Sequence, residues 1–392
     1  MEIAFVILSI ILLLSPHVNA NQTCKEKRYS IVCYLASWSV YRDGLGAFNI
    51  TDIIPSYCTH LIYSFAGLNL DGGIDSLDWY NDINVNKGYN RIIELKEENP
   101  CLKVLLAVGG WNEGSEKYSL MAESEDTRNA FADHALKFIV HFGFDGLDVD
   151  WEYPTMRGGL PDDKNNFILL LEALRTKFQR RKKLLSIAIS GSTSIMEAAY
   201  NLTAICNILD FINLMGYDYS QKNKLSIDAP LYPESTANPD SVDNAVSYIR
   251  KSGCPLAKVN LGIPTMAKTY TLKPAHVGRL LPGVDAKGPG RPGPYTKISG
   301  VLGYNELCSM IKEEKWNTKM LWNIGAKIAT QGDQWATFDD GETVAEKAKY
   351  VIGKGLGGVM FWTIDTDDFH GDCHNRVFPM VLSANREFRY TV

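Results

Sequence analysis

Eight runs of strand-favouring residues, separated by segments of helical periodicity, constrain the fold of this chain most strongly. The runs cover residues 29–38, 60–65, 103–108, 144–153, 184–190, 211–217, 259–266 and 358–364. Apolar residues recur at helical spacing in 127–142 and 165–178, on either side of the fourth run. Strands that alternate with helices form a parallel sheet, and eight such units close into a barrel. We therefore predict an α/β fold, the (β/α)8 TIM barrel.

The regular spacing fails once, between the seventh and eighth runs. Residues 267–357 form a connection far longer than those that usually join neighbouring elements. It contains a segment rich in glycine and proline at 281–295 and a helix-like segment at 304–316. We expect a small α+β insertion domain at 267–337, after strand 7, within a barrel that comprises 21–266 and 338–392.

The amino terminus has the character of a targeting segment. Its apolar run ends near Ser15, is short for a membrane span, and is followed by the small residues of Val18-Asn19-Ala20. We expect a secretory signal peptide at 1–20, cleaved after Ala20. No later stretch approaches about 20 continuous apolar residues, so we predict a secreted, extracellular protein with no membrane partner.

Charge and cysteine content narrow the class of protein further. The formal net charge is −5 and is spread without blocks, which argues against nucleic acid as a partner and favours a neutral ligand. We expect a monomer. Eight cysteines without a C-x-x-C spacing indicate disulfides rather than a metal site, although counting leaves their pairing open. Asn21, Asn49 and Asn201 begin N-x-T tripeptides that can accept glycans in a secreted protein.

The fourth run carries four acidic residues, Asp145, Asp148, Asp150 and Glu152. Because side chains alternate along a strand, the last three project to one face. The opposite face takes the apolar or aromatic residues Leu147, Val149, Trp151 and Tyr153. Crowded buried carboxylates must share protons or meet donors, and such crowding raises the pKa of at least one of them. A raised carboxyl pKa suits a general acid, so this run predicts an enzyme.

Two other interpretations of the acidic run stay open at this point. It could be an edge strand with a solvated acidic face, but such a face normally also carries lysine or threonine. It could be a calcium or magnesium site, but metal-binding loops curl around the ion instead of keeping a straight period of two. Catalytic barrels place their chemistry at the carboxyl ends of strands, where Trp111, Glu152, Tyr217, Asp218 and Trp362 fall.

Four short motifs in order resemble those of family 18 glycoside hydrolases, specifically the animal-type chitinases. Asp145-x-x-Asp148-x-Asp150-x-Glu152 is similar to the family's fourth-strand signature, and 107–111 to its third-strand signature. Residues 215–218 resemble its sixth strand, and 261–264 the seventh strand, which leads into the family's inserted α+β domain. Trp362 sits where the family places the tryptophan at the floor of its sugar pocket. The resemblance covers nearly the whole mature chain.

The resemblance implies a retaining hydrolysis assisted by the substrate, with no cofactor. Glu152 would protonate the glycosidic oxygen while the 2-acetamido oxygen of the sugar attacks its own anomeric carbon. Asp150 would hydrogen-bond the acetamido N–H, and Asp148 would share a proton with Asp150. Tyr217 would donate to the acetamido group, and Asp218 would hold the substrate or a water molecule near the cleaved bond.

The remaining candidate residues would bind the sugar chain, since aromatic rings stack on the apolar faces of sugars. They are Tyr34, Trp38, Phe65, Gly110, Trp111, Asp145, Tyr153, Met215 and Trp362. Core packing is the alternative for each ring, most of all for Phe65, whereas an indole at Trp362 is unusual for a barrel core and favours a pocket role. We expect Trp316, Trp322 and Trp335, in or near the insertion, to be core residues.

The family analogy also implies two disulfides, Cys33–Cys58 and Cys308–Cys373. It assigns no partner to the other four cysteines, of which we guess Cys206 with Cys254. His370 and His374 lie near several aspartates, but a capping loop explains them more simply than a metal, and we expect no metal.

Two departures from the family pattern bear on activity. Met266-Ala267-Lys268 stands where typical animal chitinases have Tyr-Gly-Arg, so a ring and a planar guanidinium are lost. The sequence also ends shortly after the predicted barrel without a cysteine-rich chitin-binding module, so we expect weaker action on crystalline chitin than on soluble oligomers.

The sequence predicts an endo-acting chitinase whose partners are chitin or chito-oligosaccharides. Relatives that bind the sugar without cutting it typically lose the acid at the position of Glu152, which this chain keeps. A lectin-like protein is nevertheless the alternative, with Met266 and Lys268 as the reason. Cleavage of the chitobiose core of N-glycans is a third interpretation, which the insertion domain disfavours because it deepens the groove for an extended chain.

Overall fold

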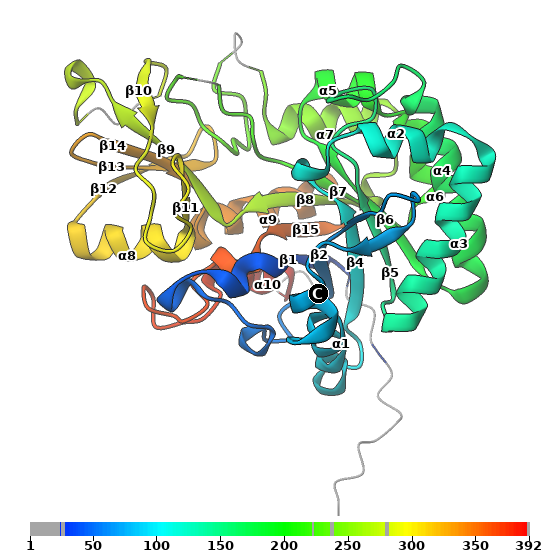
Figure 1. Ribbon diagram of the computed structural model, residues 1–392. Helices are drawn as coiled ribbons and strands as arrows, with labels where there is room; N and C mark the ends of the chain where they lie inside the picture. The colour runs from blue at the N-terminus through cyan, green and yellow to red at the C-terminus, as the bar shows by residue number, and fades with distance from the viewer. Residues whose placement is uncertain (1–23, 25–27, 222, 236–238, 279–281, 390–392) are drawn as a thin grey trace, which may run out of the picture.

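A computed structural model of the 392-residue chain describes residues 24, 28–221, 223–235, 239–278 and 282–389 (Figure 1). The expected signal peptide at 1–20 and the acceptor Asn21 lie outside the described residues. Among the helices in the described ranges, none combines the length and apolar character needed to cross a bilayer.

Eight parallel strands form a closed barrel, because β1 pairs with β2 on one side and with β15 on the other. The strands are β1 (Ser30–Ala36), β2 (His60–Leu68), β4 (Lys103–Gly109), β5 (Gly146–Asp150), β6 (Leu184–Ser190), β7 (Phe211–Met215), β8 (Val259–Pro264) and β15 (Gly358–Trp362). Each of the eight predicted runs overlaps one of them, although β2 and β4 extend past the ends of their runs, so the predicted TIM barrel is confirmed. A short strand, β3 (Ile74–Ser76), pairs antiparallel with β2.

Helices surround the barrel (Figure 1). They are α1 (Gly88–Glu98), α2 (Glu116–Glu123), α3 (Glu125–Phe142), α4 (Asp163–Phe178), α5 (Thr193–Ala199), α6 (Leu202–Ile208), α7 (Val242–Lys251), α9 (Gly341–Lys354) and α10 (Pro379–Arg389). The helices α3 and α4 confirm the two predicted from periodicity. The Ser124 side chain caps α3 by accepting from the Thr127 N–H, and Gly143 ends the helix in a left-handed conformation.

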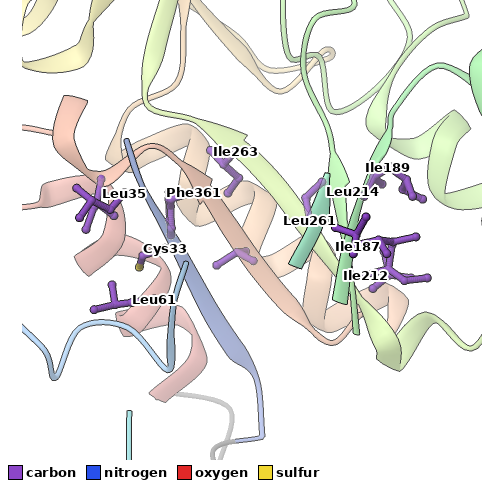
Figure 2. Close-up of a cluster of buried hydrophobic side chains, with 14 of the residues drawn as sticks. Cys33, Leu35, Leu61, Ile187, Ile189, Ile212, Leu214, Leu261, Ile263 and Phe361 are labelled. Carbon is purple, nitrogen blue, oxygen red and sulfur yellow. The ribbon is translucent and has the colours of Figure 1, made fainter. Parts of the chain in front are cut away.

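The two faces of the barrel strands meet different surroundings. Figure 2 shows side chains of alternate residues on β6, β7, β8 and β15, such as Ile187, Ile212, Leu261 and Phe361, in the buried apolar cluster. These outward-facing side chains fill the layer between the barrel and its helices. The intervening residues point into the barrel, where polar side chains such as Asn213 are buried among a smaller apolar set. The alternation predicted for β5 holds: Leu147, Val149 and Trp151 belong to the outer cluster.

The second, antiparallel sheet forms the inserted α+β unit, drawn in yellow and orange beside the barrel (Figure 1). Its strands are β9 (Met266–Leu272), β10 (Ala286–Pro289), β11 (Val301–Gly303), β12 (Asn317–Leu321), β13 (Ala326–Gln331) and β14 (Gln334–Phe338). The helix α8 (Tyr304–Glu314) follows β11. Trp316 and Trp335 are buried as expected, but the expectation for Trp322 was wrong. Trp322 lies in the turn between β12 and β13, where it is 62% exposed.

Four disulfides join the cysteines in pairs. Their partners are Cys24–Cys101, Cys33–Cys58, Cys206–Cys254 and Cys308–Cys373. Both pairs implied by the family resemblance are present, and so is the pair that we guessed. The acceptors Asn49 and Asn201 are exposed, as glycan attachment would require, and their modification stays a prediction.

Candidate active site

A cavity of about 520 Å³ opens at the carboxyl ends of the barrel strands. This volume is within the range of small-molecule binding pockets. Eleven of the fourteen predicted catalytic and binding residues line it: Tyr34, Trp38, Phe65, Gly110, Trp111, Asp150, Glu152, Met215, Tyr217, Asp218 and Trp362. The structure therefore brings together residues that are more than 300 positions apart, from Tyr34 on β1 to Trp362 on β15.

Asp148 lies behind the cavity, fully buried in the barrel. Its carboxylate accepts hydrogen bonds from the Tyr34 hydroxyl at 2.6 Å and the Ser186 hydroxyl at 2.5 Å. The Asn213 amide also donates to it, at 3.4 Å. Burial raises the pKa of Asp148 to about 6 even though these donors act in the opposite direction. The group can therefore exchange a proton at mildly acidic pH.

Three polar residues that sequence reasoning missed, Ser186, Asn213 and Asn260, support this carboxylate from β6, β7 and β8. The Asn213 side-chain amide also donates to the Tyr34 hydroxyl at 2.9 Å, and the Asn260 side-chain amide donates to Asn213 Oδ1 at 3.2 Å. The residues form a chain of hydrogen bonds across the barrel interior. A signal existed in the sequence, since each is polar at an inward position of an otherwise apolar strand.

Asp150 lies between Asp148 and the cavity, at the last position of β5. Burial raises the pKa of Asp150 well above its ordinary value, and the charges of Glu152 and Asp148 raise it further. Its Oδ1 atom is buried and has no hydrogen-bond partner among the described residues. A buried acceptor without a donor is costly, so this atom is suited to a donor that the ligand brings.

Glu152 follows the end of β5 and faces the same cavity. Burial is the main cause that raises its pKa to about 7, and the charge of Asp218 also raises it. Tyr153 and Arg157 act in the opposite direction. A carboxyl group with this pKa holds a proton below neutral pH and releases it above, as a residue that acts first as acid and then as base requires.

Arg157, which the sequence analysis did not single out, fixes the wall beside Glu152. Its guanidinium donates to the backbone oxygens of Trp111 at 2.7 Å and Glu152 at 3.0 Å. It also lies 3.5 Å from the centre of a Trp111 ring, a cation–π contact. Arg157 thus holds an exposed indole and the proposed acid in one arrangement.

Asp218 and Tyr217 come from the loop after β7. Burial raises the pKa of Asp218, whereas Lys268 on β9 lowers it, so the insertion places a positive charge near this side of the cavity. Burial also raises the pKa of Tyr217 well above its ordinary value, which keeps its hydroxyl neutral and able to donate. Asp228 lies close by: its backbone oxygen accepts from the Tyr219 N–H at 3.0 Å.

Four aromatic rings form the floor and one side of the cavity. The centre of the Trp362 ring lies 5.5 Å from that of Tyr34, 5.7 Å from Phe65 and 6.4 Å from Trp38. The rings of Trp38 and Phe65 are stacked at 6.1 Å. Such an apolar surface next to carboxyl groups can hold a neutral ligand that has both apolar faces and polar groups.

The structure contradicts the sugar-binding role expected for Asp145. This residue precedes β5, so it lies at the amino end of the barrel, opposite the cavity. Its carboxylate is engaged by Lys96 Nζ at 2.8 Å and by the Val104 N–H at 2.8 Å. Tyr153 does not line the cavity either, although its side chain lowers the pKa of Glu152. A role for Tyr153 through Glu152 stays a prediction.

One group of potential metal ligands occurs in the described part of the chain, Cys308, Asp368 and Cys373. Both cysteines are joined in a disulfide and present no thiolate. Asp368 accepts hydrogen bonds from the backbone N–H groups of Gly371, Asp372 and Cys373, which is the capping arrangement expected for this loop. The donor set therefore does not suit a metal.

Comparison with known proteins gives the family. The sequence model described as Glycosyl hydrolases family 18 matches residues 30–367. The chain belongs to this family. It is 38% identical to "Probable chitinase 2" of Drosophila melanogaster over 359 residues, which cover 88% of this chain and 73% of that protein.

Two solved structures of the family share the fold. A Group IV chitinase of Ostrinia furnacalis is 36% identical, with a TM-score of 0.88 over 92% of this chain and 100% of that chain. Human YKL-39, described as a pseudo-chitinase with retained chitooligosaccharide binding, is 32% identical, with a TM-score of 0.84 and the same two coverages. The family 18 fold therefore occurs in proteins that cut the sugar and in one that only binds it.

Proposed function

We propose that this protein is a secreted, endo-acting chitinase that hydrolyses β-1,4 linkages between N-acetylglucosamine units. The observation that carries the proposal is the position of Glu152, a carboxyl group with a pKa of about 7 on the wall of an aromatic-floored cavity. An ordinary surface glutamate would be ionised at neutral pH and could not act as a proton donor. The expected signal peptide and the four disulfides support secretion.

The first step breaks the glycosidic bond. Glu152 gives its proton to the glycosidic oxygen, and the leaving sugar departs as an alcohol. The carbonyl oxygen of the 2-acetamido group bonds to the anomeric carbon and forms an oxazolinium ion. The acetamido N–H donates to Asp150, whose buried Oδ1 has no donor among the described residues. The neutral hydroxyl of Tyr217 donates to the same acetamido group.

Asp148 lets Asp150 change its charge during this step. As positive charge develops on the acetamido group, a negative charge on Asp150 becomes favourable. The pKa of Asp148, about 6, allows it to hold the proton that Asp150 gives up. In the second step Glu152 acts as a base and takes a proton from a water molecule. The oxygen of this water attacks the anomeric carbon, and the oxazolinium ring opens with retention of configuration at that carbon.

The aromatic side chains that line the cavity would bind the sugar without charge. The rings of Trp362, Trp38 and Trp111 present flat apolar faces to a neutral pyranose, while Asp218 and Tyr217 offer polar contacts. The departure at Lys268 favours a second candidate function, a lectin that binds chito-oligosaccharides with little or no turnover. In that case the ammonium group beside Asp218, in place of a planar guanidinium, would leave the acids in place but weaken their action.

A comparison of three substrates tests the proposal. We expect the secreted protein to release the fluorophore from an N-acetylated chitotrioside, but not from its deacetylated form or from a cellotrioside, because both lack the internal nucleophile. Equal release from all three would refute the substrate-assisted mechanism. Binding of chitohexaose without release from the acetylated substrate would assign the protein to the lectin class.

A further inference from the structure

A second hollow, of about 350 Å³, is lined by residues of the turn between β12 and β13, of α9 and of the loop that precedes α7. We call it the Trp322 groove; its lining includes Tyr232, Trp322, Glu346, Lys349, Tyr350 and Lys354. Among the described residues, it shares no lining side chain with the active-site cavity. The mechanism proposed above uses none of these residues.

Two aromatic side chains of this groove face solvent on a fixed support. Trp322 is 62% exposed and Tyr232 is 39% exposed, although burial of either ring would stabilise the fold. The Tyr232 N–H donates to the Ile324 carbonyl oxygen at 3.0 Å, which ties its loop to the β12–β13 turn. The Tyr232 ring packs edge-on against Tyr350, with ring centres 6.0 Å apart. The exposed rings therefore belong to a built surface rather than to loose segments.

The charges of the groove are paired within the protein. Lys349 lies 2.8 Å from the Glu346 carboxylate, and Lys354 lies 2.7 Å from that of Asp243. The Tyr350 hydroxyl also donates to Asp243 at 2.7 Å, so this carboxylate is held in place. Each cation thus has its own carboxylate, and the groove offers hydrogen-bonding groups with no excess of either sign. Charge complementarity consequently favours a neutral ligand over an acidic or basic one.

An exposed indole and phenol beside hydrogen-bonding groups match the chemistry of a sugar, which has apolar ring faces and polar edges. The floor of the active-site cavity uses the same combination. We propose that the Trp322 groove is a second binding site for chains of β-linked N-acetylhexosamine. This inference rests on the proposed function for the identity of the sugar. A polymer held at both sites would dissociate more slowly than one held at the active site alone.

Retention on insoluble chitin tests this site. The full chain with Glu152→Gln, which keeps the shape of the active site, is compared with the same chain carrying Trp322→Ala as well. We expect roughly threefold to tenfold weaker retention when the indole is lost, in line with the contribution of one stacked ring. Trp322→Phe keeps a ring and should retain most of the binding. Ile298→Ala is the matched control, because Ile298 is an equally exposed apolar residue of the insertion, at 57%, that lines neither cavity.

The outcomes separate this site from the active site. In the protein with Glu152 intact, Trp322→Ala should leave hydrolysis of a soluble chitotrioside within about twofold of the unmodified chain, because a trioside occupies only the active site. Retention of Trp322→Ala equal to that of Ile298→Ala would overturn the proposal. So would a dimer, seen by sedimentation, that Trp322→Ala abolishes without any change in retention. If the unmodified chain fails to cleave the trioside but retention still depends on Trp322, the catalytic proposal fails and the groove stands.

Discussion

The carboxyl groups of Glu152, Asp150 and Asp148 follow one another from the cavity wall into the barrel interior. Burial raises the pKa of all three, but their partners differ: Asp148 has three donors, and Asp150 has one oxygen without any among the described residues. Three adjacent carboxylates cannot all be charged at low cost in such surroundings. The arrangement is therefore unfavourable for stability and useful for proton transfer.

Asp148 provides a test of this cost through the pH dependence of stability. Its pKa is higher in the folded than in the unfolded chain, so its contribution favours folding at low pH and is lost as pH rises toward and above about 6. Asp148→Asn removes that ionisation. We expect the melting temperature of the variant, relative to the unmodified protein, to be higher at about pH 8 than at about pH 4, with a free-energy difference on the order of 3 kcal/mol at most. Equal differences at both pH values would contradict the assignment.

Asp145 and Arg157 show the limits of sequence reasoning at this scale. The four acids look alike in sequence, but Asp145 precedes the strand and is paired with Lys96 at the other end of the barrel. Arg157 could not be found because it reaches Trp111 across a loop whose course depends on the whole fold. The spacing of acidic residues along a strand predicts on which face of the sheet their side chains lie. Contacts between loops cannot be predicted from spacing.

At the level of elements, a glycine at the end of β4 allows this strand to lie close to the backbone of Asp150 on β5, which positions the Asp150 side chain. Gly109 ends β4 with a φ of 119°, and a Cβ atom there would collide with the Asp150 backbone oxygen. The neighbouring Gly110 N–H donates to that oxygen at 2.8 Å. Only glycine tolerates both the conformation and the approach.

Gly109→Ala should therefore displace Asp150 and lower kcat by at least about tenfold, with a loss of about 1–3 kcal/mol in unfolding free energy from backbone strain and overpacking. Steady-state kinetics and thermal unfolding measure the two effects. Gly72→Ala, at an equally left-handed glycine with open space around it, is the control for strain alone. Activity of Gly109→Ala equal to that of the control would show that this approach does not position Asp150.

The insertion strand β9 influences the active site through Lys268. This cation lowers the pKa of Asp218, so its loss leaves Asp218 protonated more often. A neutral Asp218 no longer raises the pKa of Glu152. Lys268→Ala should therefore shift the alkaline limb of the kcat/KM profile to lower pH. Lys319→Ala, an exposed lysine of β12, should leave the profile unchanged, and an upward shift in Lys268→Ala would contradict the sign of this coupling.

The strands and helices could be predicted because the spacing of apolar residues along the sequence follows the pattern of buried positions in each element. All eight barrel strands and the helices α3 and α4 followed from it, although β5 is shorter than the predicted run at both ends. The polar chain through Ser186, Asn213 and Asn260 was not predicted, because those side chains meet only when the barrel closes.

At the scale of the whole molecule, the insertion is tied to the barrel covalently. Cys308 on α8 is joined to Cys373, which follows β15 and lies 65 residues later. A disulfide stabilises a fold mainly because it restricts the conformations of the unfolded chain. The wrong prediction that Trp322 is a core residue also depends on the whole molecule. The sequence indicates that an indole is apolar, but not whether another element covers it.

Removal of this disulfide should separate stability from catalysis. We expect Cys308→Ser with Cys373→Ser to reduce the unfolding free energy by about 2–5 kcal/mol, measured by denaturant titration. The kcat for chitotrioside at 25 °C should stay within about twofold, because neither cysteine lines the active-site cavity. A large loss of kcat in a variant that remains folded would mean that the cross-link positions the insertion for catalysis.

The measurement that tests the central claim most directly is the turnover and binding of chitohexaose by the Glu152→Gln variant beside the unmodified chain, across about pH 4 to about pH 8. An amide keeps the shape of the side chain but cannot donate the proton. We predict a loss of kcat by at least about a thousandfold with chitohexaose still bound, and in the unmodified chain a fall in kcat/KM as pH rises through about 7, where Glu152 loses its proton. Near-normal turnover by Glu152→Gln would contradict the account.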